Sequence, residues 1–447
     1  MRATLLLLIS ICCSLSTTAQ TLDTASLDSY LDTLADDERF MGTVLIQKDS
    51  SILYQKAVGY RDIDENRLNT VETVFRLGSI SKMFTATMIF QLIEEGKLSL
   101  DTILAEYFPL LPNSVTITIG QLLRHESGLF DYTSDPKYTS YMYTETSRNS
   151  LLSIIQMGTP AFEPGTRADY CNTNFLLLSY IIEDLDESTY AESLKARITD
   201  SIETQSIAFG DAANTSNNDA FSYMYTGEFW QFAGETHMSI PMGAGSVVGN
   251  AADVNTFITT LLSSEKLLKH SSRDLMLTTN EERYGHGIFK LPYEELNAYG
   301  HGGSIDGFRT RTAYLMDHNL AITILSNGLN YDMAAIAKTV IDAATMKEVE
   351  IPLFSEIELS EEQLAKYSGL YTSAEIPLKI TITNKEGKIV LQASGQQAFV
   401  LETDSDTEFS LAALGLIIQF DAIVGSQYQS FILRQGGGEF TFTRDQN

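Results

Sequence analysis

"RLGSISKMFTATMIFQLIEEG", residues 76–96, is the stretch on which the interpretation of this chain depends, because Ser79 stands three residues before Lys82 at the start of an apolar segment. Apolar residues recur with helical periodicity from residue 79 to residue 95, and Gly96 suits a C-terminal helix cap. Residues three apart share one face of a helix, so we expect Lys82 beside Ser79. Burial lowers the pKa of a lysine toward neutrality, and a neutral lysine beside a serine is a general base beside a nucleophile. The structural alternative is a surface lysine on an otherwise buried helix.

Two further Ser-x-x-Lys pairs occur in less suitable surroundings. Ser134 and Lys137 lie in "TSDPKYTS", a polar loop that contains proline, whereas Ser263 and Lys266 lie in "LLSSEKLLKH", a charged helix end. We interpret both pairs as structural.

A second candidate motif is "ADYCNTNF", residues 168–175, which holds the chain's single Tyr-x-Asn, formed by Tyr170 and Asn172. A tyrosine held near a lysine can move protons for the serine and the leaving group. The neighbouring amide can orient a substrate carbonyl or the lysine. The structural alternative is a half-buried tyrosine whose hydroxyl is satisfied elsewhere.

A third candidate motif is "YGHGGSIDGF", residues 299–308, which contains His301, Gly302, Gly303 and Ser304. Glycines at a strand edge leave room for a substrate backbone to approach closely. The Ser304 N–H and the Ser79 N–H could then hold an oxyanion. The structural alternative is a glycine-rich hairpin turn with a solvated histidine.

The composition and the absence of certain motifs argue against several classes of function. The 447 residues include 30 basic and 58 acidic side chains, so the net charge is −28 at pH 7. Such a surface repels nucleic acids and anionic lipids, and neither is an expected partner. The six histidines are scattered, without a His-Glu-x-x-His motif, so we expect no metal and no cofactor. An α/β-hydrolase would need Gly-x-Ser-x-Gly, and "GGSID" fails at its last position.

The first 19 residues, "MRATLLLLISICCSLSTTA", have the pattern of a secretory signal peptide: a basic start, an apolar run and a small-residue cleavage site. We therefore expect a secreted or periplasmic protein. After cleavage Cys171 is the one remaining cysteine, so no intrachain disulfide is expected. No later segment reaches the eighteen or more apolar residues of a membrane span.

Hydrophobic patterning indicates two domains. An early strand pair at residues 42–60, a helical middle and late strands at residues 297–328 predict an α/β (α+β) sandwich in which both ends of the region join one antiparallel sheet. We assign residues 22–350 to this domain. Short alternating strands with glycine-containing turns then predict a small C-terminal all-β, barrel-like domain at residues 355–447.

Taken together, "SISK", "YCN" and "HGG" resemble the serine β-lactamase and penicillin-binding-protein family, in its class C and D-alanyl-D-alanine carboxypeptidase branch. The segments "ITIGQLLRHESGL", "GAGSVVGNAADVNTF" and "YGHGIF" also stand in family order. The resemblance covers roughly residues 30–340 and implies the β-lactamase/transpeptidase-like fold. The final β domain resembles the lipocalin-like module often attached to such hydrolases.

The resemblance also implies the role of each site residue. Ser79 would be the acylated nucleophile, Lys82 and Tyr170 the proton-handling pair, Asn172 a substrate contact, and His301 the residue that recognises or polarises substrate. Two positions depart from the family pattern: His301 stands where most β-lactamases have lysine, and Cys171 stands where serine is commoner. A neutral histidine weakens the expected grip on a substrate carboxylate. A loop glutamate of the class A kind is not found in the sequence.

The resulting prediction is an exported serine hydrolase that acts through an acyl-enzyme on a peptide, amide or ester carbonyl. Its expected partner is a small-molecule or peptide substrate, and the oligomeric state is left open. The alternative is a catalytically silent relative that binds peptidoglycan stems or a partner protein.

Overall fold

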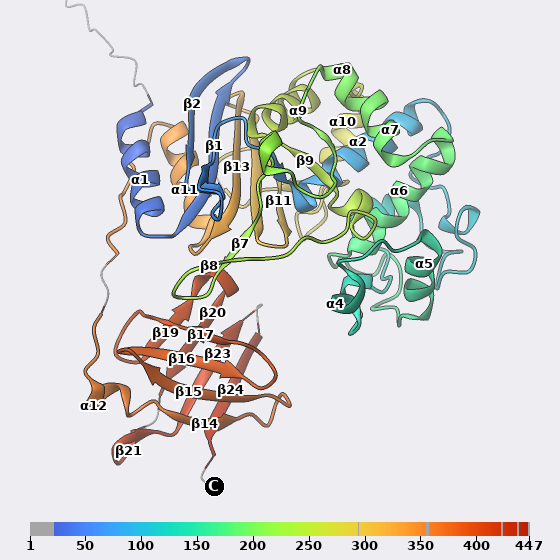
Figure 1. The fold of residues 1–447 in the computed structure, drawn as a ribbon. Coiled ribbons are helices and arrows are strands. Elements are labelled where there is room, and N and C mark those ends of the chain that lie inside the picture. The colour runs from blue at the N-terminus through green and yellow to red at the C-terminus, as the bar shows by residue number, and fades with distance from the viewer. Residues whose placement is uncertain (1–21, 294, 355–356, 422, 436–437, 446–447) are drawn as a thin grey trace, which may run out of the picture.

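The computed structural model describes residues 22–293, 295–354, 357–421, 423–435 and 438–445 (Figure 1). The predicted signal peptide, residues 1–19, lies outside these residues. No helix in the described ranges is both long enough and apolar enough to cross a membrane.

The first domain is built on an antiparallel sheet in the order β10-β11-β12-β13-β1-β2. The strands of this path are β1 (Phe40–Lys48), β2 (Ser51–Val58), β10 (Phe289–Lys290), β11 (Ala298–Ile305), β12 (Phe308–Leu315) and β13 (Leu320–Leu329). The early pair β1 and β2 therefore joins the late strands, as predicted. A small hairpin, β7 (Tyr223–Tyr225) and β8 (Trp230–Phe232), joins the sheet through β13.

Helices cover both faces of this sheet (Figure 1). Helices α1 (Thr24–Asp36) and α11 (Met333–Ala344) pack on one face and share a core with β1, β12 and β13. The other face meets α9 (Ala251–Ser263), whose Asn255 binds the Ala321 carbonyl and the Thr323 hydroxyl of β13.

The remaining helices form the region beyond α9. They are α2 (Ser81–Glu94), α3 (Ile119–Leu123), α4 (Tyr138–Tyr141), α5 (Arg148–Met157), α6 (Asn172–Asp186), α7 (Tyr190–Leu194), α8 (Asp200–Ile202) and α10 (His270–Leu277). Helix α2 is buried on almost every side, and its Phe84 stacks on Phe257 of α9 with ring centroids 3.7 Å apart. The helix predicted from Ser79 begins two residues later, because Ser79 lies in a 3₁₀ turn, η1 (Gly78–Ile80).

Short elements connect these helices. The short strands are β3 (Tyr60–Asp62), β4 (Arg67–Leu68), β5 (Phe75–Arg76), β6 (Ala208–Phe209) and β9 (Val247–Gly249). The 3₁₀ turns are η2 (Leu104–Glu106), η3 (Tyr132–Ser134), η5 (Thr215–Asn217) and η6 (Met242–Ala244), and η4 (Lys195–Thr199) is a π-helical turn. Strands β5, β9 and β6 form a sheet that leads directly into η1.

The C-terminal residues form a separate, nearly closed sheet in the order β17-β16-β15-β14-β24-β23-β20-β19-β18. Its strands are β14 (Gly369–Thr372), β15 (Lys379–Lys385), β16 (Lys388–Ala393), β17 (Ala398–Val400), β18 (Glu402–Thr403), β19 (Glu408–Leu411), β20 (Leu416–Phe420), β23 (Ser430–Gln435) and β24 (Gly438–Arg444). Strands β17 and β18 end this order and are separated by Leu401, so the sheet curls on itself around an aromatic core. Helix α12 (Glu361–Leu364), turn η7 (Ala412–Leu414) and a hairpin of β21 (Ile423–Val424) and β22 (Gln427–Tyr428) complete this part. The barrel-like fold is therefore confirmed.

Candidate active site

Ser79 is positioned by the close approach of η1 to strand β11. Gly78 adopts a positive φ of 55°, and a Cβ at this position would lie 2.8 Å from the Ser304 backbone nitrogen. A larger residue here would push the two segments apart. The Ser79 side chain is partly exposed at the start of α2, so it is open to a substrate.

Lys82 is completely buried, as the spacing predicted for the face beside Ser79. Its Nζ lies 3.0 Å from Ser79 Oγ, 2.9 Å from Asn172 Oδ1 and 2.8 Å from the Ala244 carbonyl oxygen. Burial lowers its pKa from 10.5 to about 7, while the charges of Asp131 and Cys171 act in the opposite direction. A large fraction of Lys82 is therefore neutral at neutral pH.

The three neighbours of Lys82 match the needs of a neutral amine. A neutral amine has two N–H donors and one lone pair. Asn172 Oδ1 and the Ala244 carbonyl can only accept hydrogen bonds, so they take the two N–H groups. The lone pair is then left facing Ser79 Oγ, whose hydroxyl can donate to it. The contacts thus orient Lys82 as an acceptor for the Ser79 proton.

Asn172 is held in the orientation that serves Lys82. Both its backbone N–H and its Nδ2 donate to Asp131 Oδ2, at 2.9 and 3.1 Å, and Nδ2 also reaches Thr133 Oγ1 at 3.3 Å. With its nitrogen fixed on Asp131, the amide must present Oδ1 to Lys82. The sequence suggested that this amide orients either a substrate carbonyl or the lysine. The described contacts are those that orient the lysine.

Tyr170 lies against both Lys82 and Ser79. The Lys82 Nζ is 4.8 Å from the centroid of its ring. Burial raises the pKa of the Tyr170 hydroxyl well above its usual range, and Ser79 is near enough to this hydroxyl to lower that pKa slightly. Tyr170 is therefore a phenol at neutral pH, able to donate a proton and not poised as a phenolate.

His125 is a site residue that the motif analysis missed. Its ring stacks on Tyr170 with centroids 4.4 Å apart and planes 29° from parallel, and its Nδ1 accepts the Cys171 N–H at 3.1 Å. It is fully buried, which lowers its pKa well below 6.5, and the charge of Lys82 acts in the same direction. The ring is therefore neutral with its proton on Nε2. A histidine after the apolar stretch "IGQLL" was the available signal.

The segment "HGGS" lies within strand β11, so the alternative of a solvated glycine-rich turn is wrong. His301 is 2% exposed, and burial lowers its pKa to about 3, helped by the charges of Lys82 and Arg311. A Cβ at Gly303 would lie 2.0 Å from the Leu77 carbonyl oxygen, so this glycine is required by the protein's own packing. At Gly302 the nearest atom would be 3.7 Å away, an ordinary van der Waals contact, so a Cβ would fit there. Packing therefore requires glycine at position 303 but not at position 302.

The free edge of β11 begins beyond Gly300. Strand β10 pairs with β11 through Tyr299 and Gly300 alone, so in the part of the chain that the structure describes residues 301–305 have no partner strand on that side. This edge carries the Ser304 N–H next to η1, and an extended substrate could lie along it.

Other nucleophile candidates have surroundings that do not activate them. The Cys171 thiol is buried against the Leu129 carbonyl, and burial raises its pKa to about 12. Ser134 is exposed in η3, and the Ser263 hydroxyl donates to its own helix at the Thr259 carbonyl. Within the described ranges, no group of three His, Cys, Asp or Glu side chains is placed to hold a metal ion.

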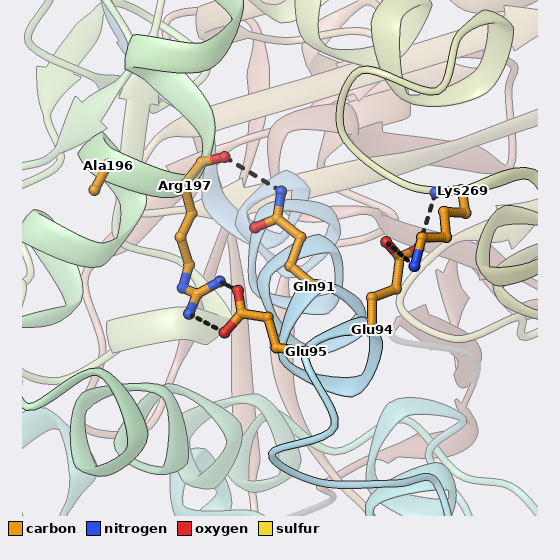
Figure 2. A pocket seen from close by; sticks show the side chains of 6 residues that line it. All are labelled: Gln91, Glu94, Glu95, Ala196, Arg197 and Lys269. Atoms are coloured by element: carbon orange, nitrogen blue, oxygen red, sulfur yellow. Dashed lines mark hydrogen bonds and ion pairs between the residues drawn. The ribbon is translucent and has the colours of Figure 1, made fainter.

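A surface pocket lies at the opposite end of α2 from Ser79 (Figure 2). It is lined by Gln91, Glu94, Glu95, Ala196, Arg197 and Lys269. Figure 2 shows the Arg197 guanidinium paired with Glu95, so the cation and the acid there satisfy each other. None of the candidate catalytic residues contributes to this pocket.

Known proteins resemble this chain in sequence and in fold. A profile of the family described as Beta-lactamase matches residues 27–346. Penicillin-binding protein 4* of Bacillus subtilis (strain 168) is 26% identical over 445 residues, covering 92% of this chain and 97% of that protein. Teichoic acid D-alanine hydrolase of Staphylococcus aureus (strain MRSA252) is 25% identical, with 60% of this chain matching 65% of that protein's length. The crystal structure of a penicillin binding protein from Bacillus halodurans superposes with a TM-score of 0.63 at 25% identity, covering 70% of this chain and 98% of that one.

Proposed function

The chain belongs to the β-lactamase family of serine hydrolases, and we propose that Ser79 is its nucleophile, activated by neutral Lys82. One observation carries this proposal: a fully buried lysine, with a pKa of about 7, has its nitrogen 3.0 Å from the Ser79 hydroxyl. Such a lysine can accept a proton at neutral pH, as a general base must.

The reaction follows from the contacts. As Ser79 Oγ attacks the substrate carbonyl carbon, its proton passes to Lys82, and the Ser79 and Ser304 N–H groups hold the oxyanion. Tyr170, a phenol beside Ser79, donates a proton to the leaving amine or alcohol and is reprotonated through Lys82. Water then attacks the acyl-enzyme and releases the acid. His301, which is buried and neutral, packs beside Tyr170, and the two ring centroids lie 6.3 Å apart.

The substrate class we propose is an amide, peptide or ester of a D-amino acid. The family acts on amide or ester carbonyls, and one relative is named for removing D-alanine from teichoic acid. The assignment of the substrate to the D-series rests on that likeness.

The experiment that tests the proposal is intact-mass analysis after exposure to a fluorophosphonate, with three proteins in parallel. We expect one adduct on the wild-type protein and on Ser134→Ala, and none on Ser79→Ala. Ser134 is the matched control because it heads another Ser-x-x-Lys pair. An adduct on folded Ser79→Ala, or none on the wild-type protein, would refute the assignment.

We also propose export and a two-domain division. The N-terminal pattern supports cleavage after Ala19, which predicts Gln20 as the first residue of protein recovered outside the cytoplasm. The division into residues 22–350 and 355–447 is supported by separate apolar cores, since every member of the third core lies at residue 359 or later. N-terminal sequencing and limited proteolysis test these two proposals.

A further inference from the structure

The structure contains a second pocket, with a volume of about 950 Å³. It is bounded by helix α7, the π-helical turn η4, strand β6 and the segment 235–242. Pockets that hold small organic ligands have volumes of about 300–1,000 Å³, so this one can hold such a ligand. Among the described residues that line it, none is a residue that we place in catalysis or in substrate contact.

One turn, η6, connects this pocket to the catalytic lysine. Met242 begins the turn and also lines the pocket. Ala244 ends the turn, and its carbonyl accepts from Lys82 Nζ at 2.8 Å. A molecule bound in the pocket is therefore separated by one short turn from the contact that orients Lys82.

Turn η6 is packed tightly against helices α2 and α6. The Gly243 carbonyl accepts from the Thr85 hydroxyl of α2 at 2.7 Å, and a Cβ at Gly243 would lie 2.7 Å from the Cβ of Ser179 on α6. Met242 has a φ of 38°, a left-handed conformation that is strained for a residue other than glycine. The helices leave no room on their side, so the turn can relax toward the pocket. A ligand that packs on Met242 would prevent this relaxation.

The lysine and arginine side chains of the pocket already have acidic partners. Arg76 is 4% exposed and pairs with Glu235 and Asp306, at 2.9 and 3.0 Å. Lys195 pairs with Asp200. A guanidinium held by two carboxylates exerts little net attraction on a further anion. The pocket is therefore poorly suited to an anionic ligand.

Two acids of the pocket have no cationic partner. Among the residues described, the Glu145 carboxylate forms no hydrogen bond or ion pair. The Asp211 carboxylate accepts only the N–H of Ala212, at 2.8 Å. A hydroxyl also lacks a partner: within the described ranges that of Thr204, a lining residue that is 9% exposed, forms no hydrogen bond. The polar groups left over at the pocket thus call for a positively charged donor.

Much of the remaining lining is apolar or aromatic. It includes Tyr143, Leu194, Ile207, Phe209 and Met238. Aromatic faces attract organic cations, and the apolar side chains favour a ligand with a hydrophobic body. The lining therefore fits an apolar molecule that carries an amine.

We propose that this pocket is a second ligand site, for an organic cation with an apolar body, and that the bound cation stabilises η6 and with it the Ala244 contact of Lys82. The binding part of this inference is independent of the proposed function. The link to Lys82 rests on the proposed function, because it assigns the ligand an effect on the catalytic base.

Binding measurements test the site without requiring turnover. Calorimetry compares 4-phenylbutylamine, a cation at neutral pH, with the neutral 4-phenylbutanol and the anionic 4-phenylbutyrate. We expect the amine to bind about threefold or more tightly than the alcohol, and the acid to bind more weakly than both, because exposed carboxylates and aromatic rings each favour a cation modestly. The double variant Glu145→Gln, Asp211→Asn should reduce the preference for the amine over the alcohol about twofold or more.

Two tryptophan variants locate the site. Ala208→Trp introduces a large side chain at an exposed position of β6 that lines the pocket, and it should abolish binding of the amine. Ala196→Trp is the matched control, because this exposed alanine lines the other pocket, at the end of α2, and it should leave binding unchanged.

The link to Lys82 is measured as the rate at which a fluorophosphonate labels Ser79. Saturating amine should raise this rate about twofold or more in the wild-type protein, because the ligand favours the turn that orients the base, and should have no effect in Ala208→Trp. A rate that the bound amine leaves unchanged or lowers would overturn the link.

Equal binding of amine and alcohol, or binding of the amine that survives Ala208→Trp, would overturn the site itself. Failure of the proposed function is distinguishable from both results. In that case the wild-type protein would not be labelled at Ser79 even in the absence of the amine.

Discussion

Replacing Lys82 with methionine should change how the stability of the protein depends on pH. The side chain is fully buried, and its pKa falls from 10.5 to about 7 on folding because burial disfavours the ammonium form. The unfolded chain therefore binds the proton more strongly than the folded chain. Between pH 7 and 10.5 the free energy of unfolding of the wild-type protein should therefore increase as pH rises.

The size of the effect follows from the shift. At about 1.4 kcal/mol per pKa unit, Lys82 costs folding about 4 kcal/mol at pH 7 and about 1 kcal/mol at pH 9.5. Methionine does not titrate, and the wild-type protein and the variant share all their other titratable groups. The acceptors that the variant leaves unpaired, Asn172 Oδ1 and the Ala244 carbonyl, add a cost that does not depend on this titration.

Urea unfolding at pH 7 and at pH 9.5 measures the prediction. The unfolding free energy of Lys82→Met relative to wild type should fall by about 3 kcal/mol between the two pH values. Lys137→Met, at an exposed lysine, is the control and should keep a constant difference. A constant difference for Lys82→Met as well would refute the claim that Lys82 is buried in a form that readily loses its proton.

Four further substitutions test the surroundings of the site. Tyr170→Phe should slow acylation by about 100-fold or more, as loss of a general acid does, measured by stopped-flow labelling; a near-wild-type rate would leave Lys82 to act alone. His125→Phe should lower the free energy of unfolding by about 1–3 kcal/mol in urea melts, because a buried N–H loses its acceptor, and unchanged stability would contradict this. Gly303→Ala should lower the free energy of unfolding by about 1–3 kcal/mol, because its Cβ would clash with the Leu77 carbonyl oxygen, whereas Gly302→Ala should be tolerated. Equal effects of the two substitutions in urea melts would argue against the packing described.

Local signals were enough to predict most of the larger elements. Alternating residues and a short turn predicted β1 and β2, and the pair Glu386-Gly387, both at positive φ, turns β15 into β16 as expected for a two-residue hairpin. Within "TIGQLLRHESGLF" the helix α3 covers only five residues, because His125 and Gly128 adopt positive φ. That backbone choice is made by tertiary contacts, since His125 packs on Tyr170.

The site was predictable to the extent that its chemistry lies in short motifs. The Ser79–Lys82 spacing within one turn fixes their contact, so the sequence could indicate it. The role of Asp131 could not be read in the same way, because its link to Asn172 joins residues 41 positions apart.

The most direct test of the central claim is the pH dependence of the rate at which a fluorophosphonate labels Ser79. We expect the rate to rise with pH, pass a midpoint near pH 7 and level off, because neutral Lys82 is the base. In Lys82→Ala the rate should fall and the midpoint should disappear. A rate that keeps rising between pH 8 and 10, or wild-type labelling by Lys82→Ala, would contradict it.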